Sequence, residues 1–310
     1  MTRTPWVDGL RALPPATVIP TGQTAGALLE LLTRPPTPDG AVFHPDVAYG
    51  TGGTGGRDLL LDLYAREDTS QRQPGVVFIH GGAWRSGDPH MHIDHAARLA
   101  ARGYVTATIE YRLSPEALWP AALEDLKCAI RWMRANAAEI GLDPDRLAAG
   151  GGSAGGHLSA LAALTPGQFE GSGGHEGRSS TIQAAVLWYP TLDLRFEGRT
   201  EQSVEPITQF LGDPTPERLQ EASPVTYVSA GCPPILTMVG DDDPVSPIPQ
   251  AEAFHASLTQ LGVPNRLEVF AGPHGFDLDQ PNWDRCCDLM IAFLDDHLAP
   301  AAPRRRPPPR

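Results

Sequence analysis

The sequence predicts an α/β fold in which helices flank a mostly parallel central sheet, with a small cap over one edge. Short apolar runs rich in β-branched residues alternate with longer amphipathic runs, which is the pattern of strands joined by helical crossovers. Hydrophobic residues make up 41% of the 310 residues and charged residues 20%, which allows a sizeable core. Two apolar runs end at glycine-rich turns, and ligands bind at the C-terminal edge of such sheets.

Six apolar runs are interpreted as strands of the parallel part. The clearest covers residues 75–80, an apolar segment that stops at a glycine pair and so indicates a strand buried on both faces. Two earlier runs are expected to form an antiparallel edge. The other central strands are predicted at 104–109, 147–150, 184–189, 234–239 and 266–270, and the edge strands at 47–49 and 59–64.

Helices are expected between these strands. One helix closes at Gly103, because glycine readily adopts the left-handed conformation of a helix end. The next begins at Pro120, carries apolar residues at steps of three and four, and is expected to end near Gly141, before a turn at 143–146. Further helices are predicted at 154–164, 249–261 and 283–298.

Residues 41–299 are expected to form the main domain. Within it, residues 191–230 carry short helical stretches and no strand pattern, which indicates an insertion over the C-terminal edge of the sheet. This insertion and the Pro-rich segment 1–40 are the candidates for a cap. Residues 165–182 predict a flexible Gly-rich loop, and the Pro/Arg tail 300–310 predicts disorder.

A glycine-flanked serine lies between a predicted strand and a predicted helix. The segment Gly151-Gly-Ser-Ala-Gly155 fits the pattern Gly-x-Ser-x-Gly. In a turn this tight the flanking positions must lack side chains, and the serine hydroxyl is left exposed above the sheet. The following helix directs its N-terminal N–H groups at the same place, which favours developing negative charge. Ser153 is therefore predicted to be a nucleophile rather than an idle turn residue.

A second glycine motif ends an earlier strand. His80-Gly-Gly-Ala-Trp84 precedes Ser153 by 73 residues and follows the strand predicted at 75–80. Two glycines let peptide N–H groups approach an acyl oxygen with no Cβ in the way. The N–H groups of Gly81 and Gly82, with that of Ala154, are predicted to bind an oxyanion.

Taken together, these motifs resemble the serine esterases of the α/β-hydrolase superfamily. The likeness is strongest to the hormone-sensitive-lipase-like carboxylesterases and to the feruloyl/acetyl esterase group. The chain departs from the former at Ala83, where they have a third glycine, and its His-Gly-Gly-x-Trp form is similar to the latter and to arylformamidases. The resemblance covers about residues 45–298 and rests on the segments 61–64, 80–84, 111–116, 119–125 and 151–157.

The resemblance implies the α/β-hydrolase fold and a triad in the chain order serine, acid, histidine. Three carboxylates follow the strand predicted at 234–239, and the family pattern Gly-x-x-Asp selects Asp243 as the acid. Since three adjacent carboxylates cannot all be buried, Asp241 is expected to be solvated or to cap the loop, and Asp242 is the alternative acid.

His274 is predicted to be the base. It lies in Gly272-Pro-His-Gly-Phe276, directly after the last predicted strand, where flanking glycines let the imidazole reach over the serine. His157 is a weaker candidate, because it comes one helical turn after Ser153 and is expected to pack against the sheet. His80 is expected to brace the oxyanion loop by hydrogen bonds.

One histidine cluster imitates a zinc site. Residues 90–95 contain the pattern His-x-His-x-Asp-His, which is real zinc-ligand spacing. The later ligands of the zinc hydrolases with that pattern have no evident counterparts in the chain, however. His90, His92, Asp94 and His95 are therefore expected at a helix start or in a loop, and no metal or other cofactor is predicted.

Composition restricts the partners. The formal net charge is −13, and −17 when the four arginines of the tail are left out (20 basic against 37 acidic residues). A protein with this much negative charge repels phosphate backbones and anionic lipid, which disfavours nucleic acid and membrane surfaces as partners. No apolar run approaches the roughly 18 residues of a membrane span, and no secretory leader is recognised. The four cysteines lack metal or redox spacing, which favours reduced thiols in a cytoplasmic protein.

The predicted function is hydrolysis of small to medium acyl esters through an acyl-enzyme. Trp84, Trp188 and Tyr189 are candidates for lining the substrate pocket, and each is equally compatible with the core. An arylformamidase or a feruloyl/acetyl-xylan esterase would use the same triad, and a non-catalytic binding protein of this fold would lack a triad member. The sequence leaves open whether the chain forms a homodimer.

Overall fold

Eight strands form one sheet in the described part of the chain, residues 37–53, 55–197, 201–278 and 280–299 of a computed structural model. The spatial order is β1-β2-β4-β3-β5-β6-β7-β8. The pairs β1–β2 and β2–β4 are antiparallel and all other neighbours are parallel, which confirms the predicted edge and centre. The strands are β1 (Ala41–Thr51), β2 (Asp58–Arg66), β3 (Gln73–Ile79), β4 (Val105–Ile109), β5 (Leu142–Gly152), β6 (Ala184–Trp188), β7 (Ile235–Gly240) and β8 (Asn265–Phe270).

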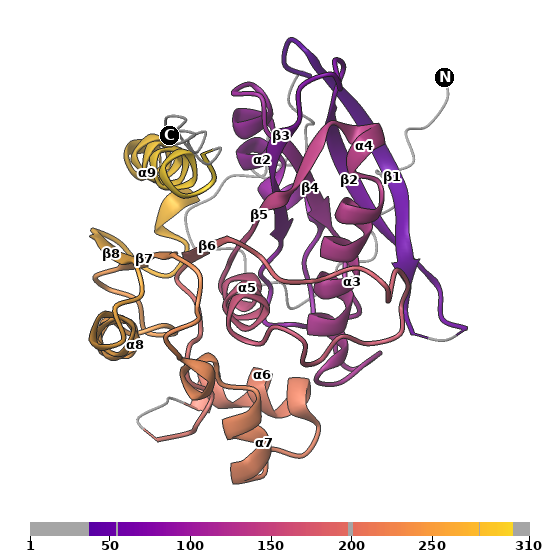
Figure 1. The fold of residues 1–310 in the computed structure, drawn as a ribbon. Helices are drawn as coiled ribbons and strands as arrows, with labels where there is room; N and C mark the ends of the chain where they lie inside the picture. Colours follow the sequence, from indigo (N-terminus) through magenta and orange to yellow (C-terminus); the bar gives the residue numbers. More distant parts are fainter. Residues whose placement is uncertain (1–36, 54, 198–200, 279, 300–310) are drawn as a thin grey trace, which may run out of the picture.

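Helices cover both faces of the sheet (Figure 1). Helices α3, α5 and α8 contribute to one apolar core, while α2 and α9 contribute to a second core on the other face. This three-layer arrangement confirms the predicted fold class. The helices are α2 (Ile93–Ala100), α3 (Ala121–Ala135), α4 (Ala137–Ile140), α5 (Ala154–Leu164), α8 (Ile248–Gln260) and α9 (Gln280–His297), with short 3-10 helices η3 (Pro89–His92) and η5 (Phe276–Leu278).

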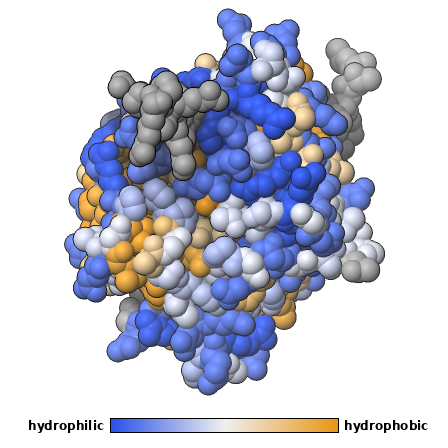
Figure 2. Space-filling model, in the orientation of Figure 1, coloured by the Kyte–Doolittle hydropathy of each residue, from blue (hydrophilic) through white to orange (hydrophobic). Residues whose placement is uncertain are grey.

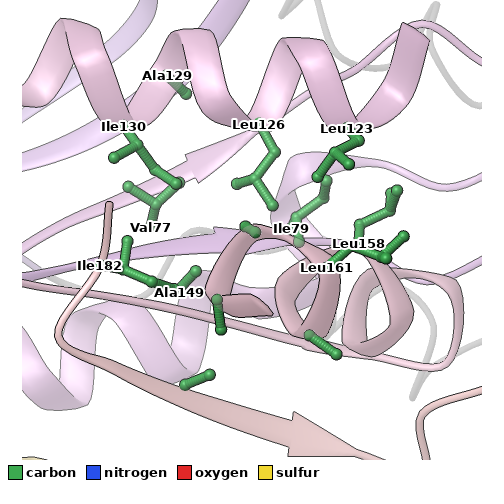
Figure 3. Close-up of a cluster of buried hydrophobic side chains, with 14 of the residues drawn as sticks. Val77, Ile79, Leu123, Leu126, Ala129, Ile130, Ala149, Leu158, Leu161 and Ile182 are labelled. Atoms are coloured by element: carbon green, nitrogen blue, oxygen red, sulfur yellow. The ribbon is translucent and has the colours of Figure 1, made fainter. Parts of the chain in front are cut away.

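The core beneath α3 and α5 fixes the strands that bear the glycine motifs. Leu123 and Ile130 of α3 point toward Val77 and Ile79 of β3, and Leu161 of α5 lies close by (Figure 3). All five side chains are fully buried. Burial of a side chain of this size stabilises the fold by about 1.5–3 kcal/mol, so the C-terminal ends of β3 and β5 are held firmly.

Two predicted boundaries after Pro120 are wrong. Helix α3 ends at Ala135, and Asn136 caps it: its side chain donates to the carbonyl of Trp132 at 2.9 Å. A separate turn, α4, then reaches Gly141, which has φ +75° and closes it. Residues 143–146 lie within β5 rather than in a turn before it, as a bulge between two positions that pair with β3.

The Gly-rich loop 165–182, which the sequence predicts to be flexible, is held by three cationic side chains of α3. Lys127 donates to the carbonyls of Thr165 and Gln168, and Arg131 donates to those of Glu170 and Gly174. A third tether runs from Arg134 to the carbonyls of residues 179 and 181. Burial lowers the pKa of Lys127 to about 8, with the charge of Glu170 acting in the opposite direction. The missed signal is the spacing of these cations on one helix face.

The segment 191–230 contains helices and no strand, as predicted, among its described residues. It comprises α6 (Glu201–Leu211), α7 (Pro216–Glu221) and the 3-10 helix η4 (Pro224–Tyr227). Figure 1 shows α6 and α7 projecting beyond α5, at one end of the molecule. The predicted contribution of residues 1–36 to a cap and the predicted disorder of the tail fall outside the described residues.

The visible surface is mostly hydrophilic. Figure 2 shows a mostly hydrophilic face on which apolar residues gather in only a few areas. Among the described helices, none combines the length and the apolar character that crossing a bilayer requires. All four cysteines lie in the described part and none is paired in a disulfide.

Candidate active site

Ser153 occupies a strained turn between β5 and α5. Its φ of +54° and ψ of −117° lie outside the regions that a serine normally adopts. The turn closes because Gly151 and Gly155 bring the chain against β3: a Cβ at either position would come within 2.3 Å of the Ile79 carbonyl oxygen. The sharp turn presents the half-buried Ser153 side chain at the sheet edge and leaves the Ala154 N–H, the first of α5, without an acceptor inside the helix.

Three side chains from distant parts of the chain meet at this turn. His274 Nε2 lies 2.9 Å from Ser153 Oγ, and His274 Nδ1 lies 2.8 Å from Asp243 Oδ2. The Asp243 side chain has no exposed surface, whereas 24% of the His274 side chain is exposed. The arrangement is a continuous hydrogen-bonded path from a buried carboxylate through an imidazole to a hydroxyl, which is the geometry of an activated nucleophile.

Asp243 is oriented by the loop that follows β7. Its second oxygen, Oδ1, accepts hydrogen bonds from the N–H groups of Val245 at 2.8 Å and Ser246 at 2.9 Å. Asp241 and Asp242 are both exposed. The Asp241 carboxylate accepts from the Gly272 N–H at 2.9 Å and so joins this loop to the one that carries His274. Of the three adjacent carboxylates, only Asp243 therefore contacts the histidine.

The predicted oxyanion loop lies against the serine. A Cβ on Gly81 would sit 2.9 Å from the Gly152 carbonyl oxygen and 3.4 Å from Ser153 Cβ. The next three residues all have positive φ, with +110° at Gly82, and the Gly82 carbonyl accepts from the N–H groups of residues 85 and 86. The structure thus places Gly81 against Ser153, next to Ala154, and Gly82 follows in the same loop.

His80 braces this loop from below. Its Nδ1 donates to the Gly81 carbonyl at 2.7 Å, and its ring stacks on Tyr111 with centroids 4.4 Å apart. Tyr111 in turn donates its hydroxyl to the His80 carbonyl at 3.2 Å. Burial lowers the pKa of His80 to about 4, so the ring is neutral at physiological pH and acts as a donor.

Trp84 connects the oxyanion loop to the insertion instead of lining an open pocket. It is 4% exposed, its ring stacks on Phe210 of α6 at 4.6 Å, and its Nε1 donates to His157 Nδ1 at 3.1 Å. His157 reaches onward from Nε2 to the Ala222 carbonyl at 2.7 Å. The expectation that His157 packs against the sheet is therefore wrong: it bridges the loop after β3 and the insertion.

The other two aromatic candidates have different positions. Trp188 has no exposed surface and belongs to the core beneath α2 and α9, so burial contradicts its predicted place in a substrate pocket. Tyr189 has φ +35°, and its ring packs against that of His274 in a T-shaped arrangement with the ring centroids 4.7 Å apart. A Cβ on Gly152 would lie 3.0 Å from its hydroxyl. Tyr189 thus borders the site from behind the serine and the histidine.

The histidine cluster at 90–95 does not converge on one point. His90 contacts Asp62 and Asp88, whereas His92 and His95 are buried against Phe78 and other rings of the second core. Across the described residues, no three His, Cys, Asp or Glu side chains are placed to hold a metal ion. The cluster occupies η3 and the start of α2, as predicted.

One ionisable side chain of the site was missed by sequence reasoning. Asp277, three residues after His274, is 2% exposed. Burial raises the pKa of its carboxyl to about 6, and a hydrogen bond from Tyr189 and the charge of His274 partly offset this. The sequence around Asp277 does not indicate that this acidic residue is buried, because its surroundings come from Tyr189 and from helix α9, which packs against η5.

In sequence and in fold the chain is similar to known esterases. The sequence model of the BD-FAE family matches residues 61–258. Esterase LipQ of Mycobacterium tuberculosis is 34% identical over 243 residues, which are 75% of this chain and 57% of that protein. The butyrate-bound structure of a thermophilic esterase from Thermogutta terrifontis, Est2, superposes with a TM-score of 0.72 at 31% identity, covering 87% of this chain and all of that one.

A third likeness is to a truncated carbohydrate esterase from gut microbiota, with a TM-score of 0.73 and 26% identity over 84% of this chain and 99% of that one. The chain spans a little over half the length of the mycobacterial relatives that it matches. These likenesses confirm the fold that the sequence motifs predict.

Proposed function

The chain belongs to the BD-FAE family of the α/β-hydrolase superfamily, and we propose that it is a serine carboxylesterase that hydrolyses small to medium acyl esters. The observation that carries the proposal is the hydrogen-bonded path from Asp243 through His274 to Ser153, with distances of 2.8 and 2.9 Å. No step of the chemistry described below calls on a cofactor.

In the first half-reaction Ser153 forms the acyl-enzyme. As Oγ attacks the ester carbonyl carbon, His274 Nε2 takes its proton, and the buried Asp243 carboxylate stabilises the imidazolium and fixes the tautomer. The carbonyl oxygen becomes an oxyanion next to the N–H groups of Gly81, Gly82 and Ala154. The imidazolium then returns its proton to the alkoxide oxygen, and the alcohol leaves.

In the second half-reaction water replaces the alcohol. His274 accepts a proton from the water as its oxygen attacks the acyl carbon, and the same proton then passes to Ser153 Oγ as the acid leaves. The Gly81 carbonyl fixes His80, the His157 imidazole fixes Trp84 and the Asp243 carboxylate fixes His274, which keeps the donors and the base in place through both steps.

The insertion supports a preference for short acyl groups. Stacking of Trp84 on Phe210, and hydrogen bonds from Trp119 to the Phe210 carbonyl and to Glu221, tie α6 and α7 to the domain next to the oxyanion loop. A lipase that covers a lipid-sized groove needs a movable apolar helix instead. The Thermogutta terrifontis relative is solved with butyrate bound, a four-carbon acid. Esters from acetyl to hexanoyl are therefore expected to exceed dodecanoyl esters in kcat/KM.

The test is hydrolysis of a panel of p-nitrophenyl esters by the wild type and by Ser153→Ala. The wild type should turn over the short esters, and the variant should retain at most about one part in 10⁴ of kcat, since loss of a triad nucleophile removes at least that factor. Ser159→Ala, which changes a buried serine six residues further along α5, is the matched control and should stay active. An organophosphonate that labels a serine other than Ser153 would contradict the assignment.

The same panel separates the alternatives. Addition of feruloyl esters, acetylated carbohydrate and N-formyl aromatic amines distinguishes a carboxylesterase from a feruloyl/acetyl-xylan esterase and an arylformamidase, which share the triad. The likeness to a carbohydrate esterase makes acetylated carbohydrate the most informative of these additions. A kcat/KM for one of them well above that for p-nitrophenyl butyrate would replace the proposed substrate class.

A cytoplasmic location and the absence of nucleic-acid and membrane partners complete the proposal. The unpaired state of all four cysteines supports the location, and the acidic charge supports the absence of these partners. Cell fractionation tests the location. Sedimentation analysis decides between a monomer and a homodimer.

A further inference from the structure

A second buried carboxylate lies behind the catalytic histidine of the proposed triad. Asp277 sits in η5, the short helix that follows the His274 loop, and only 2% of it is exposed. Its Oδ1 is buried and has no hydrogen-bond partner among the described residues. A buried carboxylate is strongly unfavourable unless a cation or several donors compensate it, so this position requires an explanation.

The surroundings of Asp277 contain almost no positive charge. Tyr189, after β6, provides a hydroxyl, and the thiols of Cys286 and Cys287 on α9 interact with the carboxylate electrostatically. The Asp243 carboxylate, in the loop after β7, acts electrostatically on the same Tyr189 hydroxyl and adds a second negative charge. Among the groups that act on Asp277 electrostatically, His274 is the one that can become a cation.

One other buried carboxylate of the domain is compensated by a fixed cation. Asp125, 1% exposed, receives hydrogen bonds from the Arg112 guanidinium and backbone N–H at 2.7–3.0 Å. That pairing is permanent, as expected of a structural ion pair. Within the described part of the chain Asp277 has no such fixed cation, and its compensating charge arises only when His274 is protonated.

We propose that Asp277 is a positioning residue of the esterase reaction, whose carboxylate orients Tyr189 and stabilises the imidazolium form of His274 from a second side. The inference rests on the proposed function, since the imidazolium forms when His274 takes the Ser153 or water proton. Tyr189 provides the mechanical link, because its ring packs against His274 and its hydroxyl lies beside Gly152, the residue before the serine. Asp243 sets the tautomer; Asp277 adds negative charge where positive charge develops.

The experiment is the pH dependence of p-nitrophenyl butyrate hydrolysis by the wild type and by Asp277→Asn between pH 5 and 9. The amide has the size of the carboxyl and can still accept from Tyr189, so the charge alone is removed. We expect kcat on the plateau to fall about tenfold with KM nearly unchanged, and the acid limb of kcat/KM to move about one pH unit lower, because a less stabilised imidazolium loses its proton more readily.

Two further variants make the result decisive. Asp288→Asn changes an exposed carboxylate of α9 and should leave both kcat and the acid limb as in the wild type. Tyr189→Phe removes the hydroxyl that favours the charged carboxylate, so Asp277 stays protonated to higher pH. Its rate deficit should be largest near pH 6–7 and should shrink toward pH 9.

The outcomes separate this inference from the proposed function. A wild type that hydrolyses none of the esters overturns the proposed function. A wild type that is active, with an Asp277→Asn variant whose acid limb does not move, overturns only the role of Asp277, even if kcat falls through loosened packing. A thermal melt of each variant establishes that it is folded, and Tyr189→Phe provides the test if Asp277→Asn is not.

Discussion

Replacement of Asp277 by asparagine is expected to stabilise the folded protein at neutral and alkaline pH. Burial raises the pKa of this carboxyl to about 6, from an ordinary value of 3.8. The folded state therefore binds more protons than the unfolded state between about pH 4 and 6, and the stability of the wild type falls as pH rises through that window. At pH 8 the ionised carboxylate lowers the free energy of unfolding by about 3 kcal/mol, and at pH 4.5 by about 1 kcal/mol.

The measurement is urea unfolding of the wild type, Asp277→Asn and Asp288→Asn at pH 4.5 and pH 8. An amide is uncharged at both values, so the free energy gained by Asp277→Asn should be about 2 kcal/mol larger at pH 8 than at pH 4.5. Any difference between an amide and a neutral carboxyl affects both values equally and cancels. The exposed carboxylate of Asp288 should change the free energy by no more than about 0.5 kcal/mol at either pH.

The reasoning is refuted if the stability difference between Asp277→Asn and the wild type is the same at both pH values. That result would mean that Asp277 ionises equally easily in the folded and unfolded states. A loss of stability at pH 8 greater than that at pH 4.5 would be still more damaging, since it would show a carboxylate that the fold stabilises.

Three further outcomes are expected. Asp243→Asn should lower kcat by about 10³–10⁴, because the tautomer-setting acceptor is lost. Asp242 is exposed and does not contact His274, so Asp242→Asn should lower kcat less than about tenfold. Equal losses in the two variants would make Asp242 the candidate acid again. Gly155→Ala should lower the free energy of unfolding by about 1–3 kcal/mol in urea titrations, because its Cβ would lie 2.1 Å from the Ile79 carbonyl oxygen. Dialysis against EDTA should leave kcat unchanged, and recovery of lost activity by zinc would return attention to residues 90–95.

The sequence predicts those parts of the site whose backbone conformation depends on a few adjacent residues. A turn as tight as that around Ser153 needs glycine at 151 and 155, and the oxyanion loop needs it at 82, so both motifs can be read from residue type alone. The strands that lead into them are equally visible, because strands buried on both faces are continuously apolar.

What sequence reasoning missed depends on contacts between distant segments. His157 bonds to Trp84 and to the Ala222 carbonyl, which are 73 and 65 residues away. The helix break at Asn136, where the side chain shares the Trp132 carbonyl with the backbone N–H, falls within an apolar periodicity that continues past it. The sequence does not distinguish a core position from a pocket position for Trp188, because each suits an aromatic side chain at a strand end.

Two features that destabilise the fold lie where the chemistry is proposed to occur. Ser153 has a strained φ of +54°, and Asp277 is a buried carboxylate without a fixed cation. Elsewhere, buried charge is compensated, as for Asp125 by Arg112 and for Lys127 by backbone carbonyls. A fold selected for stability alone would relax the turn and pair or remove the carboxylate. The strained turn and the buried carboxylate both lie beside His274, as expected of a site arranged for an imidazolium charge that exists only during the reaction. The sheet core that contains Val77 and Ile79 provides the stability that offsets their cost.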